Sequence, residues 1–161
     1  NQEECFREIK NGGMVLNGFG EIVQKQWNWL AEQYLYVELD KYVVMPNHIH
    51  GIIAIVGNGR IDGHNVGNGR DRSLHKVKPL SELIGAFKTT SSKLIHKTGL
   101  TEFQWQKSFY DHVIRNDKTL ENVRQYIINN PMKWELDIEN KININQHNKN
   151  YYEKLYSRER S

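Results

Sequence analysis

The chain has 161 residues and a mass of 19.0 kDa, enough for one domain with a buried core. Its single cysteine, Cys5, excludes an internal disulfide and a thiolate zinc finger. No apolar run reaches the ~20 residues of a membrane span. We therefore expect a cytoplasmic protein with no membrane partner. The net charge of +3 is unevenly spread: residues 57–100 carry 8 Lys/Arg against 3 Asp/Glu, which is typical of a polyanion-binding surface and equally of a solvated basic face.

The first part of the chain is predicted to hold one helix followed by one extended run. Apolar side chains recur every three or four positions from about Phe19 to Gln33, which predicts an amphipathic helix. The segment from Leu35 to Met45 then alternates as a strand does, and it leads into Pro46-Asn47, which is turn chemistry. Residues 1–11 show no clean period and predict no element.

Two histidines, His48 and His50, lie two residues apart in the apolar stretch from Val43 to Val56. Side chains alternate faces along a strand, so both imidazoles should project from one face while Ile49 points into the core. Two convergent imidazoles are half of a metal site, although such a pair is more often an exposed or hydrogen-bonded polar face. Residues 51–55 are apolar, so any third ligand must come from elsewhere in the chain.

The middle of the chain combines a polar segment with a second helix. Gly57 to Lys78 is rich in glycine, asparagine and charged residues and repeats the sequence Val-Gly-Asn-Gly-Arg, so a mobile surface loop is expected. A helical stripe follows Pro79, with Ser81 as a cap near its start. The lysines of this helix lie off the stripe, either in water or along a nucleic-acid backbone.

A further strand and a last helix are predicted after this. Residues 103–114 are dense in aromatic and β-branched side chains, which predicts a strand. Asn116 and Asp117 can cap a helix that should end at Asn130, because Pro131 disfavours helical backbone at the residue before it. The apolar stripe of this helix is formed by Leu120, Val123 and Ile127.

The last helix places Tyr126 and Asn130 about one turn apart on a shared face. A tyrosine there is by default a residue at the edge of the core. Three ordered motifs change that expectation: MPNHIHGII, WQKSFYDHVIRND and the helix that carries YIINNP. Together they resemble the IS200-like, single-tyrosine transposases of the HUH nuclease superfamily, most closely the REP-associated branch, over nearly the whole chain.

The resemblance implies an α+β fold, with a ferredoxin-like antiparallel sheet and helices packed on one face. It implies that His48 and His50 bind a divalent metal, Mg²⁺ or Mn²⁺, that Asn130 completes the metal shell, and that Tyr126 is the catalytic nucleophile. The implied activity is metal-dependent cleavage and rejoining of single-stranded DNA through a 5′-phosphotyrosine intermediate, by an endonuclease and transposase that recognises a DNA hairpin.

The resemblance also sets the expected domain organisation. Residues 1–134 form the catalytic domain, with the mobile loop inside it, and residues 135–161 form a polar C-terminal tail. Relatives usually have a further strand before the segment that matches residues 1–12, so the first strand of the family sheet is expected to be missing from this chain.

Single-stranded DNA or a DNA hairpin is the expected partner, and the sequence leaves a homodimer open. The residues expected to bind DNA are five basic side chains and one aromatic side chain: Arg70, Arg72, Lys88, Lys93, Lys97 and Trp105. For Trp105, packing in the core is the simpler role. Two other functions stay open, a nucleic-acid-binding module whose catalytic site is unused and a zinc-dependent hydrolase of small substrates.

Overall fold

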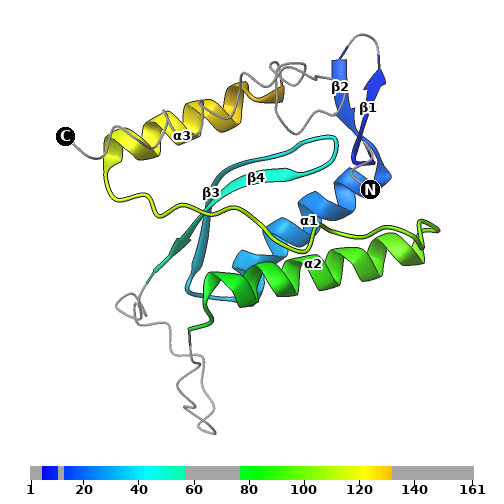
Figure 1. The fold of residues 1–161 in the computed structure, drawn as a ribbon, viewed down its shortest axis with the longest axis horizontal. Coiled ribbons are helices and arrows are strands. Elements are labelled where there is room, and N and C mark those ends of the chain that lie inside the picture. The colour runs from blue at the N-terminus through cyan, green and yellow to red at the C-terminus, as the bar shows by residue number, and fades with distance from the viewer. Residues whose placement is uncertain (1–4, 11–12, 57–76, 132–161) are drawn as a thin grey trace, which may run out of the picture.

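The computed structural model describes residues 5–10, 13–56 and 77–131. Its elements, in chain order, are β1 (Arg7–Lys10), β2 (Gly13–Leu16), α1 (Gly18–Gln33), β3 (Val37–Val44), β4 (Ile49–Ile55), α2 (Leu80–Lys97) and α3 (Asp117–Asn129) (Figure 1). These elements confirm the α+β class. The described strands form two separate antiparallel pairs, β1–β2 and β3–β4, rather than one larger sheet.

Some of the predicted segments lie outside the described residues. The expected loop falls there for residues 57–76, together with Arg70 and Arg72, and so does the expected tail at residues 135–161. None of the helices that the structure describes is both long enough and apolar enough to cross a membrane.

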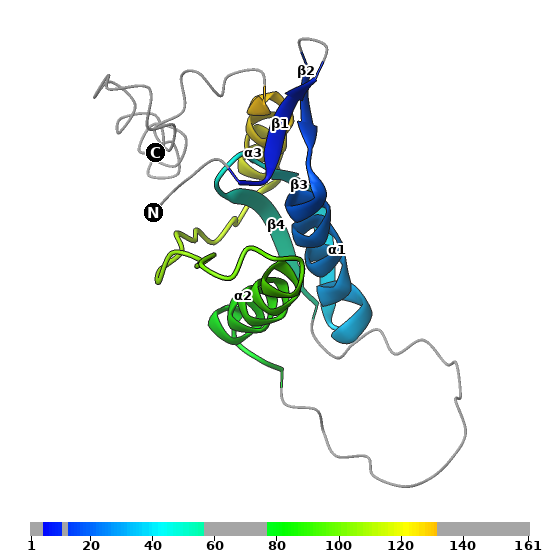
Figure 2. The ribbon, with the colours of Figure 1, turned by 90° about the vertical axis from the view of Figure 1, so that its right-hand side faces the viewer.

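The hairpin of β1 and β2 was not predicted from the sequence. It lies beyond the N-terminal end of α1 (Figure 2), where Asn17 caps the helix. The Asn17 Oδ1 accepts hydrogen bonds of 3.0 Å from the backbone N–H groups of Phe19 and Gly20, which satisfies donors that the first turn leaves open. On the side of β3, Arg7 donates from its Nε to the carbonyl oxygen of Val44. The hairpin is thereby tied to both α1 and β3.

The hairpin of β3 and β4 lies between α1 and α2 on one side and α3 on the other (Figure 1). Alternation along β4 produces this arrangement. A Cβ added to Gly51 would lie 2.3 Å from the Trp27 indole of α1, whereas the ring of the preceding residue, His50, is 5.3 Å from the Tyr126 ring of α3. The expected packing of helices on one face therefore holds for α1 and α2, while α3 covers the opposite face.

A β-bulge interrupts the alternation of β3. The register pairs Leu39 with Ile53 and Tyr42 with Gly51, so two residues of β3 stand opposite a single residue of β4. As a result, Leu39 and Tyr42 both pack against the core despite being three residues apart. Asp40, inside the bulge, is left to face α3.

The core fills the space between the β3–β4 hairpin, α1 and α2. Its buried cluster consists of Phe6, Val23, Trp27, Leu30, Val37, Val44, Leu83, Phe87, Ile95 and Phe103.

The prediction of Ser81 as a helix cap was wrong, because Ser81 lies inside α2. Pro79 occupies the N-cap position with no side-chain hydrogen bond, and its carbonyl accepts from the backbone N–H of Glu82 at 3.0 Å.

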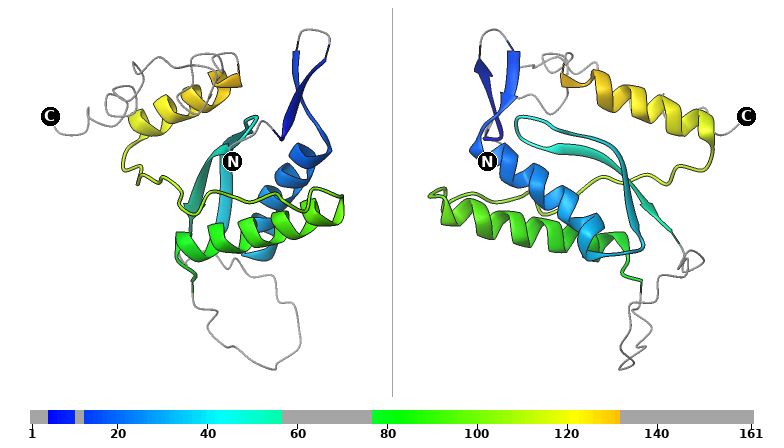
Figure 3. Two further views of the ribbon diagram at one scale, coloured as in Figure 1. Left: turned by 45° about the vertical axis from the view of Figure 1, so that its right-hand side comes forward. Right: turned by 180° about the vertical axis from the view of Figure 1, so that it is seen from behind.

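The predicted strand at residues 103–114 was also wrong: this segment is an extended connector that runs from the end of α2 back along that helix and on to α3 (Figure 3). A strand needs a ladder partner, and in the described part of the chain none pairs with it. Side chains of α2 hold it instead. Ser91 Oγ accepts from Trp105 Nε1 at 2.9 Å, and Lys88 Nζ donates to the carbonyl oxygens of Gln106 and Ser108 at 2.7 and 3.1 Å.

Candidate functional site

The two histidines meet at the start of β4. His48 ends the turn after β3, and the His48 and His50 Nε2 atoms are 2.8 Å apart, with the rings edge to face. The sequence prediction that both imidazoles project from one face is confirmed. Ile49, between them, packs against the core as expected.

The surroundings of His48 keep it neutral and fix its tautomer. Burial, and then the charge of His50, lower the pKa of His48 to about 3. Its Nδ1 lies 2.7 Å from Asn47 Oδ1, and an amide oxygen only accepts, so the His48 Nδ1 carries the hydrogen. The Nε2 atom of His48, 2.8 Å from His50 Nε2, is then the ring nitrogen that keeps its lone pair.

Tyr126 is brought to the same place by α3. The helix begins at the cap Asn116, whose Oδ1 accepts from the Thr119 backbone N–H at 2.8 Å, and it buries Val123 and Ile127. This packing leaves Tyr126 partly buried on the flank of α3, with its Oη 3.4 Å from His50 Nε2. Three predicted site residues from two distant segments therefore converge.

Asn130, the fourth predicted site residue, stands at the C-cap of α3, one position beyond the helix, which ends at Asn129 close to the predicted limit. Its side chain is buried, with 2 % exposed, and its Nδ2 has no hydrogen-bond partner among the described residues. A buried amide normally bonds through both of its polar atoms. The unpaired atom is a hydrogen-bond donor and cannot coordinate a cation, so the metal-ligand role of Asn130 stays a prediction.

The donor set can be tested for its fit to a metal ion. The described residues contain no group of three His, Cys, Asp or Glu side chains that could hold one. An amide oxygen is also a metal ligand, however, and His48 offers a neutral imidazole nitrogen without losing a proton. Two imidazoles and one amide oxygen are thus ligand types that suit a divalent ion, whereas the side chains that the structure brings together are His48, His50 and Tyr126.

A contact between α3 and β3 was not predicted from the sequence. Arg124 donates from Nε and Nη2 to Asp40 Oδ2, at 3.0 and 2.5 Å, across a separation of 84 residues. The hydrogen bonds from Arg124 are the main cause that holds the pKa of the Asp40 carboxyl below its usual range. No local pattern signals this pair, since it depends on the bulge in β3.

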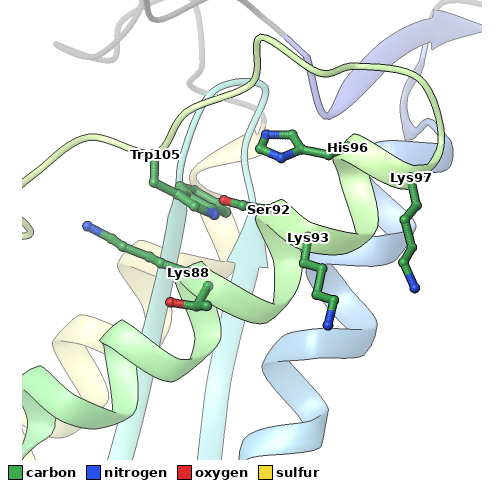
Figure 4. A pocket seen from close by; sticks show the side chains of 7 residues that line it. Lys88, Ser92, Lys93, His96, Lys97 and Trp105 are labelled. Carbon is green, nitrogen blue, oxygen red and sulfur yellow. The ribbon is translucent and has the colours of Figure 1, made fainter.

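The predicted DNA-binding residues on α2 form one edge of an open groove. It is lined by Lys88, Thr89, Ser92, Lys93, His96, Lys97 and Trp105 (Figure 4). Lys93 and Lys97 are exposed, whereas the Lys88 ammonium is engaged by the connector, and burial lowers its pKa. Trp105 packs within 5.4 Å of the rings of Phe6, Phe87 and Phe103, so it serves the core as well as lining the groove.

The fold and the site define a small α+β protein in which a histidine pair on a hairpin faces a tyrosine on a helix. The chain belongs to the same family as a protein of Haemophilus influenzae (strain ATCC 51907 / DSM 11121 / KW20 / Rd), named as an uncharacterized protein. The two are 33% identical over 141 residues, which cover 85% of this chain and 78% of the relative. No family model matches the chain, and no solved structure matches it.

Proposed function

We propose that this protein is a metal-dependent single-stranded DNA endonuclease and transposase that cleaves and rejoins DNA through Tyr126, with a DNA hairpin as its recognised substrate. The observation that carries the proposal is the convergence of Tyr126 Oη on His50 Nε2 at 3.4 Å, with His48 Nε2 a further 2.8 Å away. A phenol beside two imidazoles combines a nucleophile with donors for a cation.

The proposed reaction exchanges one phosphodiester for another. A bond forms between Tyr126 Oη and a DNA phosphorus while the bond from that phosphorus to the 3′ oxygen breaks. The phenolic proton leaves to water, and the 3′ oxygen takes up a proton to become a free hydroxyl. Because the product is a 5′-phosphotyrosine diester, the reverse attack by a 3′ hydroxyl rejoins DNA without a nucleotide triphosphate.

His48, His50 and Asn130 would hold the divalent ion, and a bound Mg²⁺ or Mn²⁺ stabilises negative charge on the non-bridging phosphate oxygens. The chain supports this arrangement with its own groups. Asn47 accepts from His48 Nδ1 and so leaves Nε2 as the coordinating atom. Burial keeps the His48 imidazole uncharged throughout the neutral pH range.

Single-stranded substrate suits a tyrosine that is held between two protein elements, since a phosphate must leave the regular duplex to reach it. The exposed Lys93 and Lys97 in the groove of α2 supply charges for the backbone of such a strand.

Formation of a covalent adduct tests the proposal. The protein is incubated with end-labelled hairpin oligonucleotides that carry single-stranded flanks, in Mn²⁺ or in chelator, and resolved on a denaturing gel. A labelled protein band that requires Mn²⁺ is expected, and Tyr126→Phe should remove it while hairpin binding persists. Tyr34→Phe is the matched control, because Tyr34 packs on Trp29 and Tyr36 beside the C-terminus of α1 and should leave the band unchanged. An adduct of wild-type strength from Tyr126→Phe contradicts the assignment.

A second function, a nucleic-acid-binding module with an unused catalytic site, is favoured by one observation. The histidines bond to each other at 2.8 Å, so the pair is satisfied without an ion. The same gel separates the two functions: the binding module retains the hairpin in a salt-dependent manner and gives no adduct with any divalent ion.

A further inference from the structure

The contact between Arg124 and Asp40 joins the helix that carries Tyr126 to the strand that pairs with the one carrying His50. Arg124 approaches one carboxylate with two nitrogens, Nε and Nη2, so it presents the flat edge of the guanidinium rather than a single charge. The arginine also approaches Glu121 on its own helix, at 3.6 Å. The pair therefore joins α3 to β3 with a defined direction.

The position of Arg124 around the helix is what links it to Tyr126. Successive residues turn by about 100°, which places Arg124 and Tyr126 about 80° to either side of the buried Val123/Ile127 face. One flank of α3 is thus bonded to Asp40 of β3, and the opposite flank carries the phenol toward His50 of β4. Rotation of α3 about its axis would break the first contact and move the second.

The apolar contacts of α3 lie apart from the main core cluster. Val123 and Ile127 are buried, but neither belongs to the main core cluster that joins α1, α2 and the hairpin. Apolar contacts are non-directional, whereas a two-nitrogen contact to a carboxylate fixes both distance and angle. The bulge that turns Asp40 toward α3 is the corresponding feature of the strand.

We propose that Asp40 and Arg124 are positioning residues that set the rotation of α3 and thereby hold the Tyr126 hydroxyl at the histidine pair. This inference rests on the proposed function for its catalytic consequence, but the placement of the ring is a property of the protein alone. Loss of the pair should lower the rate of adduct formation at saturating oligonucleotide by about 10- to 100-fold, as expected for a displacement near 1 Å, with little change in KM.

Two measurements on the full chain test this inference. The first is the nuclear Overhauser contact between the Tyr126 and His50 rings, recorded without DNA or metal. Asp40→Asn and Arg124→Gln should each weaken it, and the charge-reversed double variant Asp40→Arg/Arg124→Asp should restore part of it. Glu82→Gln is the control, since Glu82 of α2 makes an exposed ion pair at 3.9 Å with Lys78, which precedes the helix, and its loss should leave the ring contact unchanged.

The second measurement is the rate of adduct formation for the same variants. A fall in the saturated rate without a rise in KM, partly rescued by the reversed pair, is expected. If the ring contact in Asp40→Asn equals that of the wild type, the positioning role is refuted whatever the activity. If the ring contact responds as expected but the wild type forms no adduct, the positioning role stands and the proposed function fails.

Discussion

Gly51→Ala is expected to destabilise the protein through a single contact. A Cβ at this position would lie 2.3 Å from Cζ2 of the Trp27 indole, well inside contact distance. The indole cannot swing away, because Trp27 is 3 % exposed and its ring meets Phe87 at 5.3 Å and Tyr42 at 6.2 Å. Either the indole is forced into its neighbours or β4 moves toward α3.

The expected magnitude follows from overpacking of a filled core, about 1–3 kcal/mol in the free energy of unfolding. For a chain of this size that is a decrease in Tm of about 2–4 °C for each kcal/mol. Thermal and denaturant unfolding followed by circular dichroism measure it. Because His50 precedes Gly51 on the same strand, displacement of β4 should also slow adduct formation.

Gly85→Ala is the matched control for this substitution. Gly85 lies inside α2 with nothing within 4 Å of an added Cβ, so the same change should stabilise by about 0.5–1 kcal/mol through the helical preference of alanine. Equal stability of Gly51→Ala and the wild type, with Gly85→Ala shifted as expected, would refute the fixed position of Trp27.

Three further predictions concern charge and hydrogen bonding. The pKa of Asp40 is lower in the folded protein than the value of about 3.9 expected for the unfolded chain, so the ionised carboxylate stabilises the fold at pH 7. Asp40→Asn should therefore lower the free energy of unfolding at pH 7. In chemical denaturation, this difference from the wild type should vanish as the pH falls through the folded-state pKa. In ¹⁵N NMR, His48 should carry its hydrogen on Nδ1, and Asn47→Ala should abolish that preference and weaken Mn²⁺ binding by about 10-fold in titration calorimetry. Replacing Lys93 and Lys97 with alanine should lower the affinity for the DNA hairpin in anisotropy titrations. It should also reduce the slope of log affinity against log salt concentration by about 1 for each lysine. An unchanged slope would show that the groove of α2 does not contact the DNA.

Periodicity predicted the elements whose pattern is carried by many residues. The helix expected from Phe19 to Gln33 is observed from Gly18 to Gln33, and the last helix has the expected cap at Asn116. The convergence of the two imidazoles followed from the two-residue repeat of a strand. In each case the sequence pattern and the tertiary packing select the same conformation.

The predictions that were missing or wrong concern segments whose structure depends on a few residues or on contacts between distant parts of the chain. Each strand of the first hairpin has four residues, too short for a period, although the two residues between them in the sequence, Asn11 and Gly12, are a recognised hairpin signal. The connector has strand-like residues, but pairing depends on a neighbour that composition does not reveal. Lys88, expected on DNA, bonds to backbone carbonyls that only the fold brings near.

The site depends on alternation in one strand and on its interruption in the other. In β4, alternation turns Gly51 to the core and His50 to α3, so the residue that fixes the strand and the residue that serves the site are adjacent but on opposite faces. In β3, uninterrupted alternation would turn one of Leu39 and Tyr42 away from the core. The bulge keeps both on the core and leaves Asp40 to hold α3. Deleting a residue from this bulge would therefore disturb either the core or α3, whereas a substitution of Asp40, which leaves the bulge in place, can affect α3 alone.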